Sequence, residues 1–239
     1  MKIQIITCLQ DNYSYLIIDE ENNTACVIDP SEATPIIEYL ENNKIKLKFI
    51  LNTHHHYDHV GGNQRLKEKY GASVVGYRKD KKRIPEIDIL LDDQEIWIHQ
   101  NFETKIIYIP GHTLGHICFY FYKEQSVFTG DTLFSLGCGK IFEGTYSQMF
   151  NSLMKFKELP QDTKVYCGHE YTKKNSDFCL THDANNENLK TKIDIIDEKL
   201  KSGLPTIPST IKDELECNIF LRSNNVKTFS KLRDLKDNF

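Results

Sequence analysis

Four candidate metal ligands lie within seven residues, in the run THHHYDH at positions 53–59. In a locally extended segment, residues two positions apart point to the same side, so His54 and His56 can hold one ion. Asp58 and His59 follow directly and can turn toward a second ion. An exposed histidine-rich turn is the alternative, but the density of donors favours a site for two metal ions.

Three further candidate ligands each stand beside a glycine at the end of a predicted strand. They are His112 in the run PGHT, Asp131 in TGD and His169 in CGHE. A strand end holds a side chain rigidly, and glycine lets the backbone approach closely. Together with the four loop residues, these three residues make seven nitrogen and oxygen ligands. These ligands would satisfy two ions if both ions share Asp131.

Short strands and a few helices must position these side chains. The predicted strands mix β-branched and aromatic residues and end at turn-forming residues. They cover residues 2–7, 13–19, 25–29, 47–51, 73–75, 89–91, 95–98, 105–109, 116–122, 126–129 and 164–166. Capping residues or apolar steps of three and four predict helices over residues 31–43, 63–70, 147–158, 189–200 and 226–236. The histidine cluster therefore lies on a strand-to-helix loop.

The pattern changes along the chain, which predicts two domains. Two β-rich halves meet around residues 84–88, and helical periodicity dominates from about residue 171. We expect an α+β fold in which residues 1–170 form a catalytic sandwich of sheets with helices outside. Residues 171–239 are expected to form a helical domain.

The composition excludes several classes of protein. The chain has 239 residues, of which 39% are hydrophobic and 27% charged, and its net charge is −4. No apolar run approaches the roughly 18–20 residues of a membrane span, and the first residues lack a signal-peptide pattern. The seven cysteines contain no C-x-x-C pair, which favours reduced thiols. We expect a cytoplasmic protein that binds neither membranes nor nucleic acid. The oligomeric state is open, with a monomer as the working expectation.

The motifs THHHYDH, GHT, TGD and GHE, in this order and spacing, resemble those of the metallo-β-lactamase superfamily. A closer resemblance is to the hydroxyacylglutathione hydrolases, or glyoxalase II, and it covers essentially the whole chain. It rests on DNY at 11–13, GCGK at 137–140, EGT at 143–145, CGHEYT at 167–172 and LRDLKD at 232–237. The resemblance implies an αββα sandwich of two mixed β-sheets flanked by helices, with a C-terminal helical domain that binds substrate.

The same resemblance implies a role for each motif residue. The first metal would be bound by His54, His56 and His112, the second by Asp58, His59 and His169, with Asp131 bridging. The glutathione moiety would be held by Lys140, Tyr171, Arg233 and Lys236. Zinc is the expected metal, although histidine and carboxylate ligands also suit iron and manganese. In one departure, many family members have a tyrosine where this chain has Phe142, so a hydroxyl contact to the substrate is missing.

The implied reaction is hydrolysis of an S-(2-hydroxyacyl)glutathione, such as S-D-lactoylglutathione, to a 2-hydroxy acid and glutathione in methylglyoxal detoxification. Two bound cations lower the pKa of a water from about 15.7 toward 7 and so supply a nucleophile. A thiol with a pKa near 8.5 leaves without a strong general acid. Asp58 and Asp131 are the expected catalytic carboxylates, Asp58 as a ligand that also orients and Asp131 as the bridge.

Two alternatives stay open at this point. A mononuclear-iron persulfide dioxygenase shares the THxHxDH-type loop, but the C-terminal helical segment with Arg233 and Lys236 argues against it. A non-catalytic metal-binding protein is the second alternative, and the intact ligand positions argue against that. His55 and His116 are expected to support the ligands without being ligands themselves.

Overall fold

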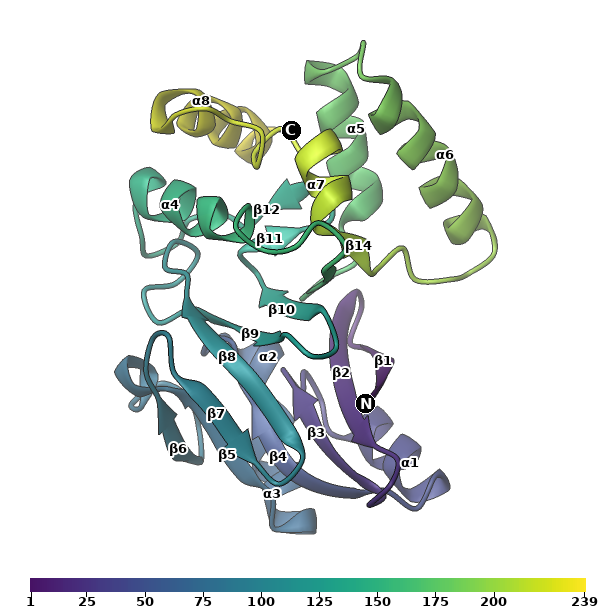
Figure 1. Ribbon diagram of the computed structural model, residues 1–239, viewed down its shortest axis with the longest axis vertical. Helices are drawn as coiled ribbons and strands as arrows, with labels where there is room; N and C mark the ends of the chain where they lie inside the picture. The colour runs from purple at the N-terminus through teal and green to yellow at the C-terminus, as the bar shows by residue number, and fades with distance from the viewer. The chain divides into compact units, whose positions relative to one another are not determined.

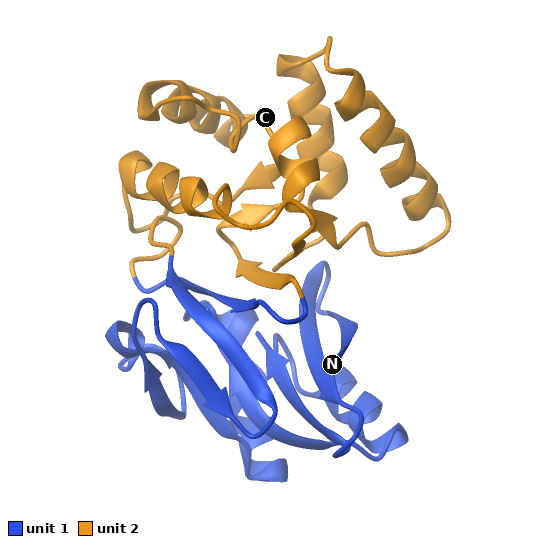
Figure 2. Ribbon diagram, viewed as in Figure 1, with its two compact units in different colours: residues 1–108, 115–124 blue, residues 109–114, 125–239 orange.

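The computed structural model describes residues 1–239 and divides into two compact units (Figure 2). Unit 1 comprises Met1–Tyr108 and Gly115–Glu124, and unit 2 comprises Ile109–Leu114 and Gln125–Phe239. The histidine-rich loop belongs to unit 1, whereas the three later candidate ligands belong to unit 2.

Unit 1 contains a mixed six-stranded sheet in the order β1-β2-β3-β4-β5-β6 (Figure 1). Its strands are β1 (Lys2–Cys8), β2 (Asn12–Asp19), β3 (Thr24–Ile28), β4 (Lys46–Leu51), β5 (Ser73–Tyr77) and β6 (Ile87–Leu91). Strands β1 to β3 pair antiparallel, and β3 to β6 pair parallel. Neighbouring parallel strands end at the same edge of a sheet, so the segments after β3 and β4 lie side by side. That edge carries Asp29 and the histidine-rich loop.

Helices α1 (Thr34–Asn42) and α3 (Asn63–Tyr70) cover one face of this sheet. Leu40 of α1 and Leu66 of α3 are buried in the same hydrophobic cluster as Ile50 of β4. Each helix therefore buries one apolar stripe against the sheet. The short helices α2 (Tyr57–Val60) and η1 (Arg78–Asp80) complete the helices of the unit.

Three antiparallel strands pack against the other face of the sheet. They are β7 (Ile96–His99), β8 (Phe102–Tyr108) and β9 (Ile117–Phe121). Successive side chains of a strand point to opposite faces, so Phe49 points away from the cluster that contains Ile50. The Phe49 ring meets Trp97 of β7 edge to face, with centroids 5.0 Å apart. Two layers of strands with helices outside one of them form unit 1.

Unit 2 combines a small sheet, a hairpin and five helices. The strands are β10 (Ser126–Gly130), β13 (Lys164–Cys167) and β14 (Ser209–Thr210), and the hairpin is β11 (Leu133–Phe134) with β12 (Gly137–Cys138). Strand β10 runs parallel to β13, and β13 runs antiparallel to β14. The helices are α4 (Tyr146–Phe156), α5 (Thr172–His182), α6 (Glu187–Lys201), α7 (Ile211–Cys217) and α8 (Val226–Asp237).

Local signals explain where these helices begin. A capping box between Thr145 and Gln148 starts α4, and the Asn225 side chain caps α8. Phe178 of α5 stacks on Phe220, which lies in the segment between α7 and α8, with ring centroids 5.8 Å apart, and both rings are buried. None of the helices combines the length and the apolar character that crossing a membrane requires.

Most predicted elements are confirmed to within a few residues. The predicted helix over residues 147–158, for example, is α4. The two-residue strands of the β11–β12 hairpin, which are too short to show a period, were not predicted. Helices α5 and α7 fall in the region expected to be helical but were not predicted individually. The predicted boundary between a catalytic domain (residues 1–170) and a helical domain (residues 171–239) falls between β13 and α5. This division of function stays a prediction.

All seven cysteines are free and buried. Burial raises the pKa of the Cys167, Cys179 and Cys217 thiols to about 12. These thiols therefore hold their protons at neutral pH.

Candidate metal centre

The candidate ligands of unit 1 lie on and just after the loop between β4 and α2. The ring centroids of His54 and His56 are 4.8 Å apart, and those of His54 and His59 are 4.2 Å apart. His54 and His59 are buried, while His56 and Asp58 are half-buried. The loop thus brings together the donors that its spacing predicts.

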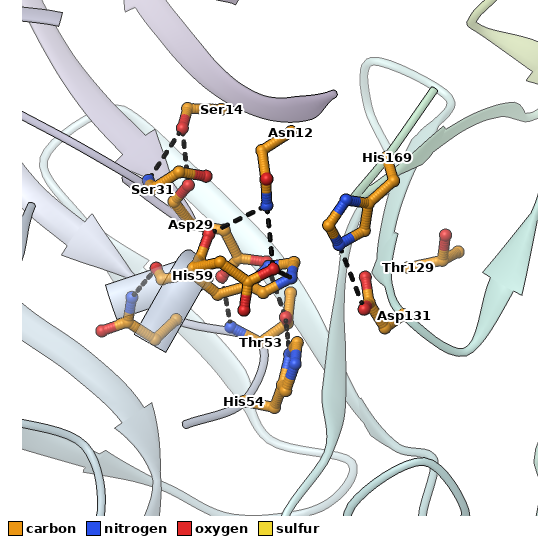
Figure 3. Close-up of polar contacts among 12 residues, drawn as sticks. Asn12, Ser14, Asp29, Ser31, Thr53, His54, His59, Thr129, Asp131 and His169 are labelled. Atoms are coloured by element: carbon orange, nitrogen blue, oxygen red, sulfur yellow. Dashed lines mark hydrogen bonds and ion pairs between the residues drawn. The ribbon is translucent and has the colours of Figure 1, made fainter. Parts of the chain in front are cut away.

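A buried aspartate, Asp29, holds this loop in place (Figure 3). Its carboxylate accepts from the Thr53 backbone N–H at 2.7 Å and from the Thr53 hydroxyl at 2.6 Å. The same carboxylate accepts from His59 Nδ1 at 3.1 Å. A proton held at Nδ1 leaves Nε2 of His59 as the nitrogen that can bind a metal.

Asp29 itself also counts among the possible metal-binding donors of this unit. One ligand atom from each of Asp29, His54 and His59 lies within 4.8 Å of the others. Both carboxylate oxygens already accept hydrogen bonds from the loop, so the geometry favours an orienting role. The sequence motifs do not single out Asp29, because its partners lie 24 and 30 residues away.

Asn12 orients the carboxylate of Asp58. The Asn12 amide donates to the Asp58 backbone carbonyl and to Asp58 Oδ2, both at 3.1 Å. Asp58 Oδ2 lies 3.7 Å from His59 Nε2, so the two donors face each other. The DNY run near the start of the chain thus has a defined place beside the ligand loop.

Two other histidines support the loop. His116 is buried, and its ring stacks on His54 with centroids 4.5 Å apart. His55 Nδ1 lies 3.4 Å from the buried carboxylate of Asp80. His116 and His55 therefore border the ligand loop without belonging to the predicted ligand set.

The three candidate ligands of unit 2 converge on one carboxylate. Asp131 follows β10 and His169 follows the adjacent parallel strand β13, so both project from one sheet edge. Asp131 Oδ2 lies 3.3 Å from His169 Nε2 (Figure 3) and 3.6 Å from His112 Nε2. All three side chains are buried. One carboxylate oxygen of Asp131 therefore faces both imidazole nitrogens.

The backbone after the β11–β12 hairpin orients His112. The Lys140 carbonyl accepts from His112 Nδ1 at 2.8 Å, which leaves Nε2 facing Asp131. Only glycine fits at position 139. A Cβ on Gly139 would lie 1.9 Å from the Asp131 carbonyl oxygen and 3.3 Å from His112 Nδ1.

Two aromatic side chains flank the imidazoles of unit 2. The Tyr171 ring stacks on His169, with centroids 4.7 Å apart and planes 5° apart. The Phe142 ring meets His112 edge to face at 5.2 Å and is 61% exposed. Phe142 therefore presents an apolar surface where a tyrosine would have offered a hydroxyl.

The three basic residues predicted to bind substrate differ in their surroundings. Lys140 is exposed, with Nζ 5.8 Å from the Phe142 ring. Arg233 is only 5% exposed and donates from Nη1 to the Cys138 carbonyl at 2.7 Å. The helical spacing of Arg233 and Lys236 predicts that their charges share one face of the helix. Arg233, however, directs its Nη1 donor into the protein.

Lys236 is half-buried, between the exposed Lys140 and the buried Arg233. Its Nζ donates to the Lys174 carbonyl at 2.9 Å and lies 5.0 Å from the Phe178 ring centroid. Burial, with smaller contributions from the charges of Lys174 and Arg233, lowers the pKa of Lys236 to about 8. Its charge is therefore sensitive to pH in the physiological range.

The donor chemistry fits divalent metal ions. Imidazole nitrogens and carboxylate oxygens are the ligands that zinc, iron and manganese share. The chain carries groups of three such donors whose ligand atoms lie within 4.8 Å of one another. Acceptors at Nδ1 of His59 and His112 prepare these imidazoles to bind through Nε2.

Comparisons with known families cover almost the whole chain. Residues 10–169 match the family described as the metallo-beta-lactamase superfamily. Residues 170–239 match the family described as the hydroxyacylglutathione hydrolase C-terminus.

Similar proteins of known name agree with these matches. A hydroxyacylglutathione hydrolase of Pelagibacter ubique (strain HTCC1062) is 76% identical over 239 residues, the full length of both chains. Another from Bradyrhizobium sp. (strain ORS 278) is 42% identical over 97% of this chain and 91% of the relative.

Solved structures show the fold. The ETHE1 structure from Myxococcus xanthus matches with a TM-score of 0.75 at 23% identity, over 98% of this chain and 90% of the other. The BLEG-1 B3 metallo-beta-lactamase matches with a TM-score of 0.73 at 21% identity, over 93% of this chain and all of the other. The expected metallo-β-lactamase sandwich with a C-terminal helical extension is therefore confirmed.

Proposed function

Because this chain belongs to the hydroxyacylglutathione hydrolases of the metallo-β-lactamase superfamily, we propose that it hydrolyses S-(2-hydroxyacyl)glutathione thioesters, such as S-D-lactoylglutathione. It is an enzyme of the glyoxalase II class, and its products are a 2-hydroxy acid and glutathione. The observation that carries the proposal is the place of Asp131, whose Oδ2 faces both His112 and His169.

Two divalent metal ions are proposed for the centre. His54, His56 and His112 would hold one ion, Asp58, His59 and His169 the other, and Asp131 would bind both. Zinc is the proposed metal, with iron or manganese as alternatives that the same donors accept. When bound, two such ions lower the pKa of a water and polarise the thioester carbonyl.

The chain's own residues prepare the site for this reaction. Asp29 holds His59 and the start of the ligand loop, and Asn12 holds Asp58. The Lys140 carbonyl fixes the ring of His112. These contacts are made before substrate arrives, so little reorganisation is needed when the reaction begins. The leaving thiol has an ordinary pKa near 8.5 and needs no strong general acid.

The glutathione moiety is proposed to contact Lys140 and Tyr171 directly, with Arg233 and Lys236 contributing positive charge. The exposed Lys140 and the position of Tyr171 against His169 support this assignment. Phe142 would form an apolar wall of the same site. A monomer in the cytoplasm is the proposed state of the protein.

A direct experiment is elemental analysis of the purified protein together with hydrolysis of S-D-lactoylglutathione. We expect two metal ions per chain and loss of the thioester absorbance. Oxygen consumption with glutathione persulfide, without thioester loss, would favour the dioxygenase alternative. Folded protein that binds metal and turns over neither substrate would favour a non-catalytic metal-binding protein.

A further inference from the structure

The β11–β12 hairpin, residues 133–138, is held by side chains from the C-terminal helices. All five backbone carbonyls from Phe134 to Cys138 accept from these side chains. Asn218 Nδ2 donates to Gly137 at 3.0 Å and to Phe134 at 3.5 Å, Asn175 Nδ2 to Ser135 at 3.1 Å, Cys179 Sγ to Leu136 at 3.2 Å and Arg233 Nη1 to Cys138 at 2.7 Å. The donors lie on α5, at the end of α7 and on α8.

A buried carboxylate stands at the centre of these contacts. Glu214 of α7 is fully buried and accepts from the Leu136 backbone N–H at 2.9 Å and from Asn218 Nδ2 at 2.8 Å. Leu136 has a φ of 58°, a left-handed conformation that a leucine adopts only when its surroundings enforce it. The Asn218 side-chain oxygen accepts from the Phe220 N–H at 3.0 Å, which fixes the amide in turn.

Such an arrangement specifies geometry more than it adds stability. Burying a carboxylate and two amides carries a desolvation cost that apolar side chains would avoid. Asn175 and Asn218 are both at most 5% exposed, and each directs its amide at a hairpin carbonyl. Several buried hydrogen bonds that converge on one hairpin favour a single backbone conformation there.

The hairpin connects two parts of the proposed metal centre. It begins two residues after Asp131, and the Thr129 hydroxyl donates to the Leu133 carbonyl at 2.7 Å. It ends just before Gly139, whose N–H donates to the Thr132 carbonyl at 3.2 Å. The next residue, Lys140, orients His112 through its carbonyl. A shift of the hairpin would therefore move the shared carboxylate and turn an imidazole.

We infer that Glu214 and Asn218 are positioning residues of the metal centre, acting through the β11–β12 hairpin on Asp131 and His112. This inference rests on the proposed function and deepens it. The C-terminal helices then serve the metal centre as well as the glutathione moiety. Their contribution is to set the position of ligands that they do not themselves supply.

The test compares metal affinity in three variants of the full-length protein. Asn218→Leu keeps the number and branching of the side-chain heavy atoms but removes the hydrogen bonds to Gly137 and Glu214. Glu214→Gln keeps an acceptor for the Leu136 N–H and serves as the conservative replacement. Ile211→Ala, in the same helix, is the matched control, because the buried Ile211 side chain can form no hydrogen bond to the hairpin.

The readouts are zinc retained against a competing chelator, kcat and KM for S-D-lactoylglutathione, and the Tm of the zinc-loaded protein. We expect Asn218→Leu to lose zinc affinity by about tenfold or more and to lower kcat more than it raises KM. Glu214→Gln should stay within about threefold of wild type. Ile211→Ala should lower the Tm while zinc affinity is kept.

Zinc affinity equal to wild type in Asn218→Leu would overturn the inference. So would an equal loss of affinity in Asn218→Leu and Ile211→Ala at a similar Tm. If Asn218→Leu does not fold, Asn175→Ala, which removes the donor to Ser135, gives the same comparison from α5. A wild-type protein that binds zinc but leaves the thioester intact would refute the proposed activity, and the zinc affinities of the variants would still decide this inference.

Discussion

Asp29 and His59 form a buried hydrogen bond, with carboxylate Oδ2 and ring Nδ1 3.1 Å apart. The two residues are 30 positions apart in sequence and are brought together at the edge where β3 and β4 end. The proposed ligand is thus oriented by a residue that follows a different strand.

The first prediction is that Asp29→Ala weakens metal binding by about 10–100-fold, the usual effect of losing a group that orients a ligand. Zinc content after dialysis against a chelator measures this. Asp29→Asn is the matched control, since its amide oxygen can still accept from Thr53, and it should lose less. Full zinc content in Asp29→Ala would show that His59 needs no such partner.

The second prediction compares two residues beside His112. Asp131→Ala should abolish thioester hydrolysis, by at least about a hundredfold, and lower the metal content, because it removes the proposed shared ligand. Phe142→Ala should keep the metal and chiefly alter KM, because Phe142 contributes only an apolar surface. Elemental analysis and steady-state kinetics measure both. Two metals per chain and near-normal turnover in Asp131→Ala would show the ligand assignment to be wrong.

The third prediction concerns the pH dependence of substrate binding. The pKa of Lys236 is lowered to about 8, so its positive charge is present below that pH and lost above it. The kcat/KM for the glutathione thioester should therefore fall as the pH rises through about 8. In Lys236→Arg the charge persists, so this fall should disappear. An identical fall in wild type and variant would assign the titration to another group.

The fourth prediction separates Arg233 from Lys236 by substrate. Lys236→Ala should raise KM for the glutathione thioester by about tenfold and leave a small thioester without the peptide unaffected. Arg233→Ala should impair both substrates, because Arg233 holds the Cys138 carbonyl two residues before Lys140. Kinetics on the two thioesters provide the measurement. The same substrate pattern in both variants would contradict the distinction.

The fifth prediction follows from the burial of Glu214, which raises its pKa from 4.5 to about 7. Between these values the folded state keeps the proton that the unfolded state has lost, so stability falls as the pH rises through this window. The loss amounts to about 3 kcal/mol at most. Urea unfolding at pH 5 and pH 8 should show this loss in wild type and not in Glu214→Gln. Parallel changes in the two proteins would locate the titration elsewhere.

The ligand motifs were predictable because each combines donor residues with a strand end or a short spacing. In the loop at residues 53–59, the spacing alone predicts which side chains point the same way, since side chains two positions apart share a side in an extended segment. His112, Asp131 and His169 could be placed at strand ends because a strand and a following glycine are local signals. No contact between distant residues was needed for these predictions.

The orienting residues could not be predicted in the same way. Asp29 meets Thr53 and His59 only because β3 and β4 pair in parallel, and no local pattern specifies that pairing. Glu214 and Asn218 contact the hairpin from about 80 residues further along the chain. Helical spacing shows that Arg233 and Lys236 share a face, but it does not show whether that face is buried.

The burial of all seven thiols protects them from reactions with the glutathione that this enzyme releases and with its disulfide. Its reaction releases glutathione, a thiol that exists beside its own disulfide wherever oxidants are present. Mixed-disulfide formation requires an accessible thiolate, and both burial and a pKa of about 12 keep Cys167, Cys179 and Cys217 from supplying one. The folded chain can therefore produce glutathione continuously without becoming a target of glutathionylation itself.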